Sequence, residues 1–496
     1  MKKCLYFLTV FVCVYSLLVS CHNESHNTTK GNKSDLKALD TFMFDGDYQL
    51  TAKIKDNSII YFTGSDDYGY RAYLHITENG MELRRVNTHT NENILLKRKD
   101  SKNVFPADLK ILKNGNFFRF WVGDNTEWVR GPLGEWAEIY DPFSSQIFCH
   151  TENGKKVDLD IIGREWMTQF PGEVVRYGEP GSFYEQQAIP GAILEYEGMY
   201  YLYFMAGMIG DEEGSSRRTI GLAKSKDLIN WEVSPDPVVT YKDYPYDNLY
   251  INGVALTPDN KVGIMFSAQD FPKWMGLMLA VADHPEGKFE KCEKQPVYKH
   301  KSAAHEFDLI DMKEPVLEYD GVKYRYMLFY AGFTGSTSSY AAGDKGFIIY
   351  SNDLKEWVYR EDNPLFFPET SDNWDCGHVR PRSLTKIGDE WYLWYEGCNV
   401  WNPPGKGSDQ WCDVIGLARS KDLVNWEYHP RNPVLAGIGQ KDSYCGSSWV
   451  GWPKMIIKDN VGYVFFCGTH DHGKVSITYR TIPIEKLTDW QSDMKN

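Results

Sequence analysis

The sequence predicts an all-β protein, with an N-terminal β-sandwich of the jelly-roll type followed by a five-bladed β-propeller. Short alternating segments without helical periodicity fill the first third of the 496 residues, which favours a sandwich. In the rest of the chain, aromatic and β-branched runs bounded by Gly, Pro and Asp form a unit that recurs every ~50 to 60 residues, with roughly four strands per copy. Five such copies predict five blades.

Residues 1–20 have the features of a secretory signal. Lys2 and Lys3 precede an apolar run that is too short for a spanning helix. The run ends in Leu18-Val19-Ser20-Cys21, which resembles the lipobox of bacterial lipoproteins. The resemblance implies that Cys21 is lipidated and that the protein is anchored in the bacterial cell envelope, at the outer membrane or periplasmic face. An ordinary signal with an incidental cysteine is the alternative. Residues 21–40 are predicted to form a flexible tether.

Residues 41–166 are predicted to form the sandwich. Nine short segments separated by Gly, Asn and Asp turns are expected to be strands: 48–55, 58–63, 71–77, 81–86, 93–99, 107–113, 117–122, 137–140 and 146–150. The order YLHITENGMELRRV, then ADLKILKNGNFFRFWVGD, resembles a concanavalin A-like jelly roll of the laminin-G type. That resemblance implies a domain that binds carbohydrate or buttresses the propeller, and both roles stay open.

Residues 167–496 are predicted to form the propeller. The five copies share strand runs followed by a compact turn, and they cover residues 190–239, 248–298, 314–365, 375–435 and 447–490. Trp231, Trp357 and Trp426 close the turn in three copies. We expect these tryptophans to pack between blades and assign them no catalytic role.

Rare carboxylates at positions that are apolar in the sister copies predict the catalytic site. Alignment on a recurrent proline makes Glu314 equivalent to Ile189, Arg380 and Trp452, and it makes Glu396 equivalent to Ala206, Ser267, Ala331 and Cys467. Packing does not explain a lone carboxylate at either position, so Glu314 and Glu396 are the predicted acid and base or nucleophile pair. Glu185 and Asp311 are the reserves.

Substrate contacts are expected from basic and aromatic side chains around the same funnel. Arg380 and Arg382 suit a substrate carboxylate or hydroxyls, and His378 is expected to contact substrate. Four tryptophans are expected to stack on sugar rings: Trp374, Trp401, Trp411 and Trp449. An ion-pair network of Glu314, Arg380, Arg382 and Glu396 that plugs the axis is the alternative.

Composition excludes several function classes. A formal charge of −14 and the lack of a Lys/Arg stripe argue against nucleic acid as a partner. The cysteines contain no CxxC pair, so no zinc site is predicted. No cofactor is predicted, and calcium at the propeller axis stays open. Contact with a membrane is expected through the lipid anchor only.

The turns GLAKSKDLINW and GLARSKDLVNW, with strands such as PGAILEYEGMYYLYF, resemble the five-bladed propeller glycosidases of glycoside hydrolase families 43, 32 and 117. The resemblance covers roughly residues 178–490 and implies an enzyme that hydrolyses a terminal sugar from plant or algal oligosaccharides or polysaccharides. The chain departs from family 43 by having Ile189-Pro190 where an Asp-Pro is usual. Two alternatives therefore stay open: an inactive propeller that binds surface glycans, and a polysaccharide lyase.

Overall fold

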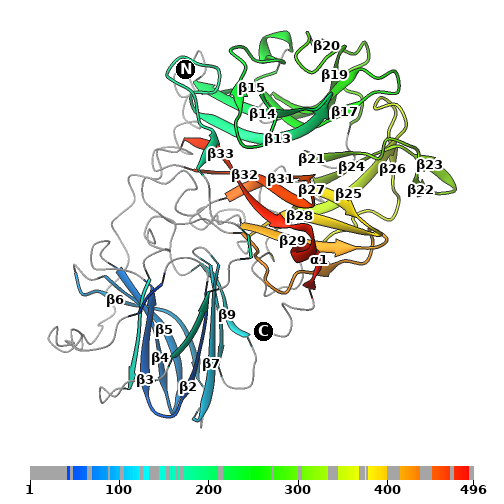
Figure 1. Ribbon diagram of the computed structural model, residues 1–496. Coiled ribbons are helices and arrows are strands. Elements are labelled where there is room, and N and C mark those ends of the chain that lie inside the picture. The colour runs from blue at the N-terminus through cyan, green and yellow to red at the C-terminus, as the bar shows by residue number, and fades with distance from the viewer. Residues whose placement is uncertain are drawn as a thin grey trace, which may run out of the picture.

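The structure is a computed structural model, and it is almost entirely β (Figure 1). It describes residues 42–44, 48–63, 70–87, 90–100, 105–114, 117–122, 127–132, 145–151, 157, 159–163, 166–167, 172–209, 216–244, 246–270, 273–299, 304–332, 344–367, 375, 378–398, 414–435, 450–469 and 474–490. Among these residues, the short helix α1 spans Ile484–Thr488 and the 3-10 helix η3 spans Tyr241–Asp243. No helix in these ranges is long and apolar enough to cross a bilayer.

The N-terminal strands form a sandwich of two antiparallel sheets. The first sheet has the order β1 (Phe42–Phe44), β10 (Ser145–Thr151), β3 (Ser58–Thr63), β4 (Tyr70–Thr77), β5 (Gly80–Asn87) and β6 (Asn93–Asp100). The second has the order β11 (Leu159–Gly163), β2 (Tyr48–Ile54), β7 (Ala107–Asn114), β8 (Phe117–Val122) and β9 (Glu127–Pro132). Leu50, Leu74 and Ile111 are fully buried in one cluster that draws on both sheets. Alternation of inward and outward residues along each strand builds this core.

Most of the strands predicted in this region are confirmed within a residue or so. The expected strand at residues 137–140 lies outside the described residues. Three further strands, β1, β9 and β11, were not predicted from the sequence. Each of these three is short or flanked by polar residues, so its alternation is hard to distinguish from a loop.

The C-terminal strands form five antiparallel blades, which confirms the predicted propeller. Blade 1 comprises β13 (Gln187–Tyr196), β14 (Met199–Ile209), β15 (Ser216–Ser225) and β16 (Glu232–Val233). Blade 2 comprises β17 (Asn248–Leu256), β18 (Val262–Asp270), β19 (Lys273–Ala282) and β20 (Glu290–Lys291). Blade 3 comprises β21 (Ala304–Asp311), β24 (Tyr326–Gly332), β25 (Lys345–Ser351) and β26 (Val358–Tyr359). Along the chain, a hairpin of β22 (Leu317–Tyr319) and β23 (Val322–Tyr324) connects the first two strands of that blade.

Blade 4 comprises β27 (His378–Ile387), β28 (Glu390–Cys398), β29 (Val414–Ser420) and β30 (Glu427–Tyr428). Blade 5 comprises β31 (Val450–Lys458), β32 (Val461–Thr469), β33 (Val475–Pro483) and β12 (Glu173–Val175). Its outer strand β12 therefore comes from the start of the domain and closes the ring.

The inner strands form a closed circle around the axis. β13 packs against β17, β17 against β21, β21 against β27, β27 against β31, and β31 against β13. All five inner strands run in the same direction around the ring. The start of an inner strand lies beside the start of the third strand of the preceding blade, and the two strands are parallel. Examples are Asn248 beside Arg218, Gln187 beside Val475, and Val379, whose N–H donates to the Asp344 carbonyl. The inner strands therefore begin on one face of the disc, which we call the N-terminal face, and end on the C-terminal face.

The repeated turn has the same backbone hydrogen bonds to its aspartate in blades 1, 3 and 4, and in blades 1 and 3 its tryptophan also donates to a backbone carbonyl. In blade 1, Asp227 accepts backbone N–H bonds from Ile229 and Asn230, and Trp231 Nε1–H donates to the Leu228 carbonyl. Leu228 has φ of 69°. The ring of Trp231 then lies edge-on to Phe465 of blade 5, at 5.5 Å between centroids. The turn therefore places a tryptophan against the neighbouring blade, as the sequence predicts.

Candidate active site

Strand register defines which residues of the five blades are equivalent. In each blade, one residue of the third strand pairs both with the second strand and with the outermost segment, through an isolated bridge in blades 1 to 4 and through β12 in blade 5. The partners of these residues on the second strand are equivalent: Met205, Ser267, Ala331, Glu396 and Cys467. The inner-strand residues opposite these are Ile189, Tyr250, Glu306, Arg380 and Gly451. The predicted ring of second-strand positions is confirmed except in blade 1, where Met205 takes the place of Ala206.

The register corrects the predicted position in blade 3. The inner-strand residue there is Glu306, and Glu314 instead follows the end of β21 in an exposed turn. Alignment on prolines was wrong for this blade because Pro315 lies after the strand, whereas Pro190 and Pro381 lie inside β13 and β27. Glu396 lies opposite Arg380, near the start of β27. The structure therefore does not bring Glu314 and Glu396 together, because Glu314 lies on the C-terminal face of the disc and Glu396 lies toward the N-terminal face.

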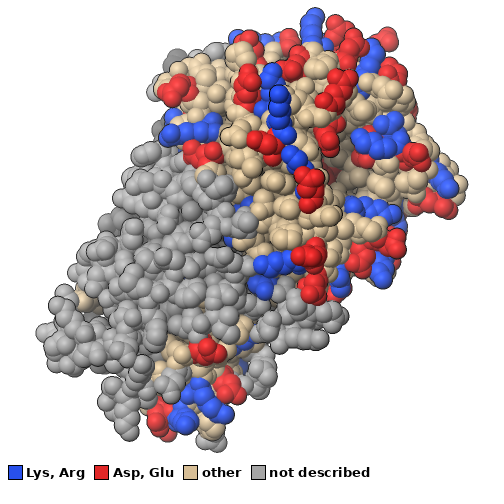
Figure 2. Space-filling view, viewed as in Figure 1, with Lys and Arg blue, Asp and Glu red and all other residues tan. Residues whose placement is uncertain are grey.

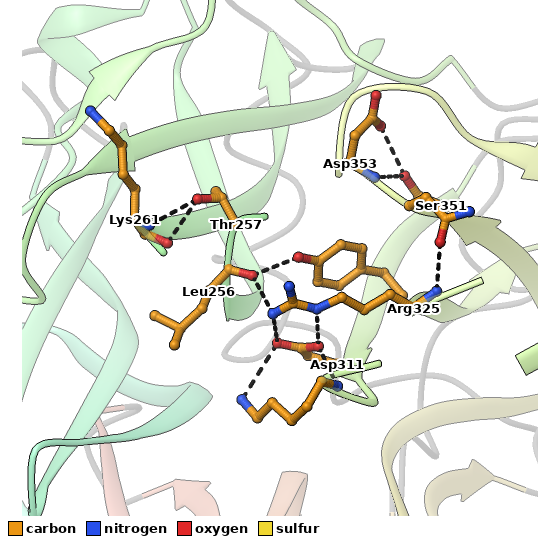
Figure 3. A network of polar contacts seen from close by, with 10 residues as sticks. Leu256, Thr257, Lys261, Asp311, Arg325, Ser351 and Asp353 are labelled. Atoms are coloured by element: carbon orange, nitrogen blue, oxygen red, sulfur yellow. Dashed lines mark hydrogen bonds and ion pairs between the residues drawn. The ribbon is translucent and has the colours of Figure 1, made fainter. Parts of the chain in front are cut away.

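Asp311, one of the reserves, also lies on the C-terminal face. Its two oxygens accept from Arg325 Nε at 2.8 Å and Arg325 Nη2 at 2.9 Å, and the same Nη2 donates to the carbonyl of Leu256 at the end of β17 (Figure 3). Burial acts to raise the pKa of Asp311, but the hydrogen bonds from Arg325 and the charge of Lys313 outweigh it and hold the pKa below its usual range. This bidentate pair ties blade 2 to blade 3, which is a structural role.

Glu396 forms the best-enclosed ion pair at the axis. Its side chain is fully buried, with Oε2 accepting from Arg382 Nη2 and Oε1 accepting from the backbone N–H of Trp452. The Arg382 guanidinium lies over the Trp452 ring, 4.4 Å from its centroid. Blades 4 and 5 are therefore linked by one carboxylate, and Arg382 is held in a single orientation by charge and by the ring face.

A second buried ion pair joins blades 3 and 5 beside β27, the inner strand of blade 4. Lys454 Nζ lies 2.8 Å from Asp308 Oδ1 and also donates to the Arg382 carbonyl, while Asp308 Oδ2 accepts from the Leu384 N–H at 2.7 Å. Burial raises the pKa of Asp308 and lowers the pKa of Lys454, because each charged form has lost its water. The pair therefore links the inner strands of blades 3, 4 and 5.

The remaining predicted polar residues lie near the N-terminal face. His378 is the first residue of β27 and is buried. Arg380 is buried and its Nε donates to Asp344 Oδ2 at 2.7 Å. Glu185, two residues before β13, is nearly buried and accepts the Gly181 N–H at 2.6 Å. The N-terminal face therefore holds His378, Arg380 and Glu185, as predicted. The ion pairs of Arg380, Arg382 and Glu396 agree with the alternative prediction, an ion-pair network at the axis.

A small cavity opens beside these pairs on the axis. It has a volume of about 10 Å³, which is room for about one water molecule, and is lined by Ile189, Pro190, Met205, Tyr250, Ile251, Asn252, Arg382, Trp452 and Lys454. Four inner strands contribute to this lining. The lining therefore combines polar residues, among them Arg382 and Lys454, with apolar ones.

Five predicted residues lie outside the described residues: Trp374, Trp401, Trp411, Trp449 and Cys21. Among the described residues, Trp452 is the tryptophan that lines the axial cavity. Its backbone has φ of 51°. From the sequence, Trp452 was identified only as an equivalent of Glu314.

Glu306, Asp344 and Lys454 were not predicted from the sequence. The signal for Glu306 was the run HEFDLID, which alternates apolar and polar residues as β21 does. Nothing in the local sequence marks Lys454 as the partner of Asp308, since 146 residues separate them.

Among the residues that the structure describes, no group of three or more His, Cys, Asp or Glu side chains is arranged to hold a metal. Figure 2 shows acidic and basic side chains interspersed over the visible face of the propeller, without a large patch of one sign.

Solved structures with a similar arrangement include three carbohydrate-active proteins. One is a thermostable family-43 glycoside hydrolase, with 16% identity over 62% of this chain and 91% of that chain and a TM-score of 0.44. Another is a β-1,2-mannobiose phosphorylase from Listeria innocua in complex with β-1,2-mannobiose, with 14% identity over 64% and 97% and a TM-score of 0.45. A glycosyl hydrolase from Bacteroides ovatus has 16% identity over 64% and 94% and a TM-score of 0.42.

No curated protein matches the sequence. Residues 188–381, which cover blades 1 to 3 and the start of blade 4, match the glycosyl hydrolases family 32 N-terminal domain. This segment is therefore similar to the N-terminal domain of family 32 glycosyl hydrolases, and the match supports a glycosidase that acts on a carbohydrate substrate.

Proposed function

We propose that the enzyme removes a terminal sugar from plant or algal oligosaccharides or polysaccharides, by acid and base carboxylate chemistry at the N-terminal face of the axis. The observation that carries the proposal is the strand register. Glu306 of β21 takes the position that Arg380 takes in β27, and Glu185 lies two residues before β13. These two carboxylates come from blades 1 and 3, which are not neighbours in the ring. Glycoside hydrolysis requires such a pair on either side of the scissile bond.

The axial ion pairs support cleavage at a chain end. The Asp308–Lys454 pair joins the inner strands of blades 3 and 5, and we expect a ligand that enters from the N-terminal face to meet a closed floor there. A closed floor admits the end of a sugar chain and excludes a chain that passes through. This is the geometry expected of an enzyme that takes terminal residues.

Arg382 and Glu396 have different roles in this proposal. Arg382 lines the axial cavity and contacts the sugar, with His378 and Arg380 nearby at the start of the same strand. Glu396 has both oxygens occupied, so it acts as a positioning residue that holds Arg382 rather than as the acid or base. Trp452 offers a ring beside the same cavity.

The test is hydrolysis of a panel of plant and algal oligosaccharides by Glu306→Gln and Glu185→Gln variants. Each substitution keeps the side-chain volume and removes the titratable group, so kcat should fall by more than about 10²-fold. Glu318→Gln is the matched control, because Glu318 is exposed in β22 on the C-terminal side of blade 3. Unchanged turnover in both Glu306 and Glu185 variants would reject the assignment.

A glycan-binding propeller without hydrolysis is the second candidate. The observation that favours it is the chemistry of blade 1, where apolar Ile189 and Met205 take the positions of Arg380 and Glu396. Binding of a glycan without release of any sugar would support this candidate. Release of an unsaturated, ultraviolet-absorbing product would instead indicate a polysaccharide lyase.

We also propose that the enzyme acts at the bacterial cell envelope, held by a lipid on Cys21. The motif Leu18-Val19-Ser20-Cys21 after an apolar run supports this location. Incorporation of labelled fatty acid into the wild-type protein, and its loss in Cys21→Ser, would support the anchor. Equal labelling of both proteins would contradict it.

A further inference from the structure

Arg218 differs from the other arginines described on the N-terminal face. Arg380 is paired with Asp344, Arg382 with Glu396, and Arg217 with Asp247 at 3.1 Å. Among the described residues, Arg218 has no carboxylate within ion-pair distance. Its Nη1 donates to the Tyr250 hydroxyl, and its guanidinium lies 5.0 Å from the centre of that ring. A half-buried cation thus remains without a counter-charge.

Two buried acceptors lie in the same row of the sheet. Strand register aligns Gln187 with Gly207, Gly207 with Arg218, and Arg218 with Asn248, across four consecutive strands. Within the described part of the chain, Gln187 Oε1, Asn248 Oδ1 and Arg218 Nε are buried without a hydrogen-bond partner. Asn248 is only 7% exposed. Buried polar atoms are rarely left unpaired, so this row points to a ligand that supplies both hydroxyl donors and an acceptor.

Aromatic rings flank the row. Tyr250 lies 5.0 Å from Trp274 between ring centroids, and Tyr250 also lines the axial cavity. The Gln187 side chain packs over Gly207, because a Cβ at that position would lie 3.1 Å from Gln187 Oε1. The row therefore adjoins the axis, and its floor is suited to the C–H face of a sugar ring.

We propose that Gln187, Arg218, Asn248 and Tyr250 form a subsite for a sugar that carries a negative charge, either a carboxylate or a sulfate ester. The anion pairs with the free N–H groups of Arg218, and sugar hydroxyls donate to Gln187 Oε1 and Asn248 Oδ1. The inference rests on the proposed function only in taking a carbohydrate as the ligand. The substrates would then be acidic or sulfated glycans.

The test measures binding rather than turnover, by NMR titration of the full chain. The probes are D-galacturonate, D-galactose 6-sulfate and neutral D-galactose, which differ at one carbon. A charge-assisted hydrogen bond makes an anionic probe bind about 10-fold or more tightly than galactose. Comparison of the two anionic probes distinguishes a carboxylate site from a sulfate site.

Arg218→Met should abolish the preference for the anion, and Arg218→Lys should retain part of it. Arg217→Met is the matched control, because it removes the same charge from the adjacent residue of β15, whose cation is already paired with Asp247. Circular dichroism checks that each variant is folded. Equal preference in wild type and Arg218→Met, or equal loss in Arg217→Met, would overturn the proposal.

The two proposals fail separately. If the Glu306 and Glu185 variants keep full turnover while Arg218→Met loses the anion preference, the catalytic assignment fails and the subsite stands. If catalysis depends on those carboxylates while Arg218→Met keeps the preference, only the subsite is rejected.

Discussion

Replacing Glu396 with glutamine tests the buried axial pair most directly. The side chains of Arg382 and Glu396 are 2% and 0% exposed, and both Glu396 oxygens accept hydrogen bonds. Glu396→Gln leaves the Arg382 cation buried without a counter-charge. It also points an NH₂ group at either Arg382 or the Trp452 N–H, each of which is a donor.

The expected cost to the free energy of unfolding is about 3 to 5 kcal/mol, the range found when one partner of a buried ion pair is removed. Urea unfolding followed by tryptophan fluorescence would measure it. Removing Arg382 as well, in Glu396→Gln/Arg382→Met, should recover about 2 kcal/mol, because the uncompensated charge is then gone.

Glu427→Gln is the control for this experiment. Glu427 also pairs with an arginine, Arg419, at 2.7 Å, but its side chain is 52% exposed. Water screens such a pair, so the loss should be at most about 1 kcal/mol. If Glu396→Gln costs no more than Glu427→Gln and shows no coupling to Arg382, the reasoning about burial is refuted.

Three further predictions concern other parts of the propeller. Glu314→Gln should leave turnover unchanged, because Glu314 is exposed beyond the end of β21; a loss of about 10²-fold in kcat would restore the role predicted from the sequence. Hydrogen bonds from Asn230 hold the pKa of Asp227 far below its usual range, so its charge stabilises the fold above pH ~4 and that contribution is lost as the pH falls toward the folded-state pKa. Asp227→Asn should therefore lower the melting temperature at pH 7 and have little effect at the acid end, which a series of thermal melts would reveal; an equal effect at both pH values would contradict the charge argument. Gly253→Ala should cost about 1 to 3 kcal/mol in urea unfolding, because the added Cβ would lie 2.1 Å from the Cβ of Leu309; a neutral result would mean that blades 2 and 3 can separate at little cost.

Local sequence determined the blades and their turns. The strand β24, Tyr-Met-Leu-Phe-Tyr-Ala-Gly, is buried throughout because both faces of a blade pack on neighbours, and that continuous apolar run is visible without coordinates. The turn around Asp227 is closed by hydrogen bonds between residues within three positions of one another. Interactions of such short range depend on the immediate sequence, so the fold class and the packing role of Trp231 were predictable.

Tertiary structure decided which charged side chains meet at the axis. Pairing depends on strand register, on the bulge that follows Pro190 and Pro381, and on the place where β21 ends. Pro315 follows β21, whereas Pro190 and Pro381 lie inside their strands, so alignment on prolines selected Glu314 instead of Glu306. The Asp308–Lys454 contact joins residues 146 positions apart, and no local pattern encodes it. These contacts between charged side chains form only when the five blades close into a ring, because that closure brings the inner strands of blades 3, 4 and 5 together around one axis.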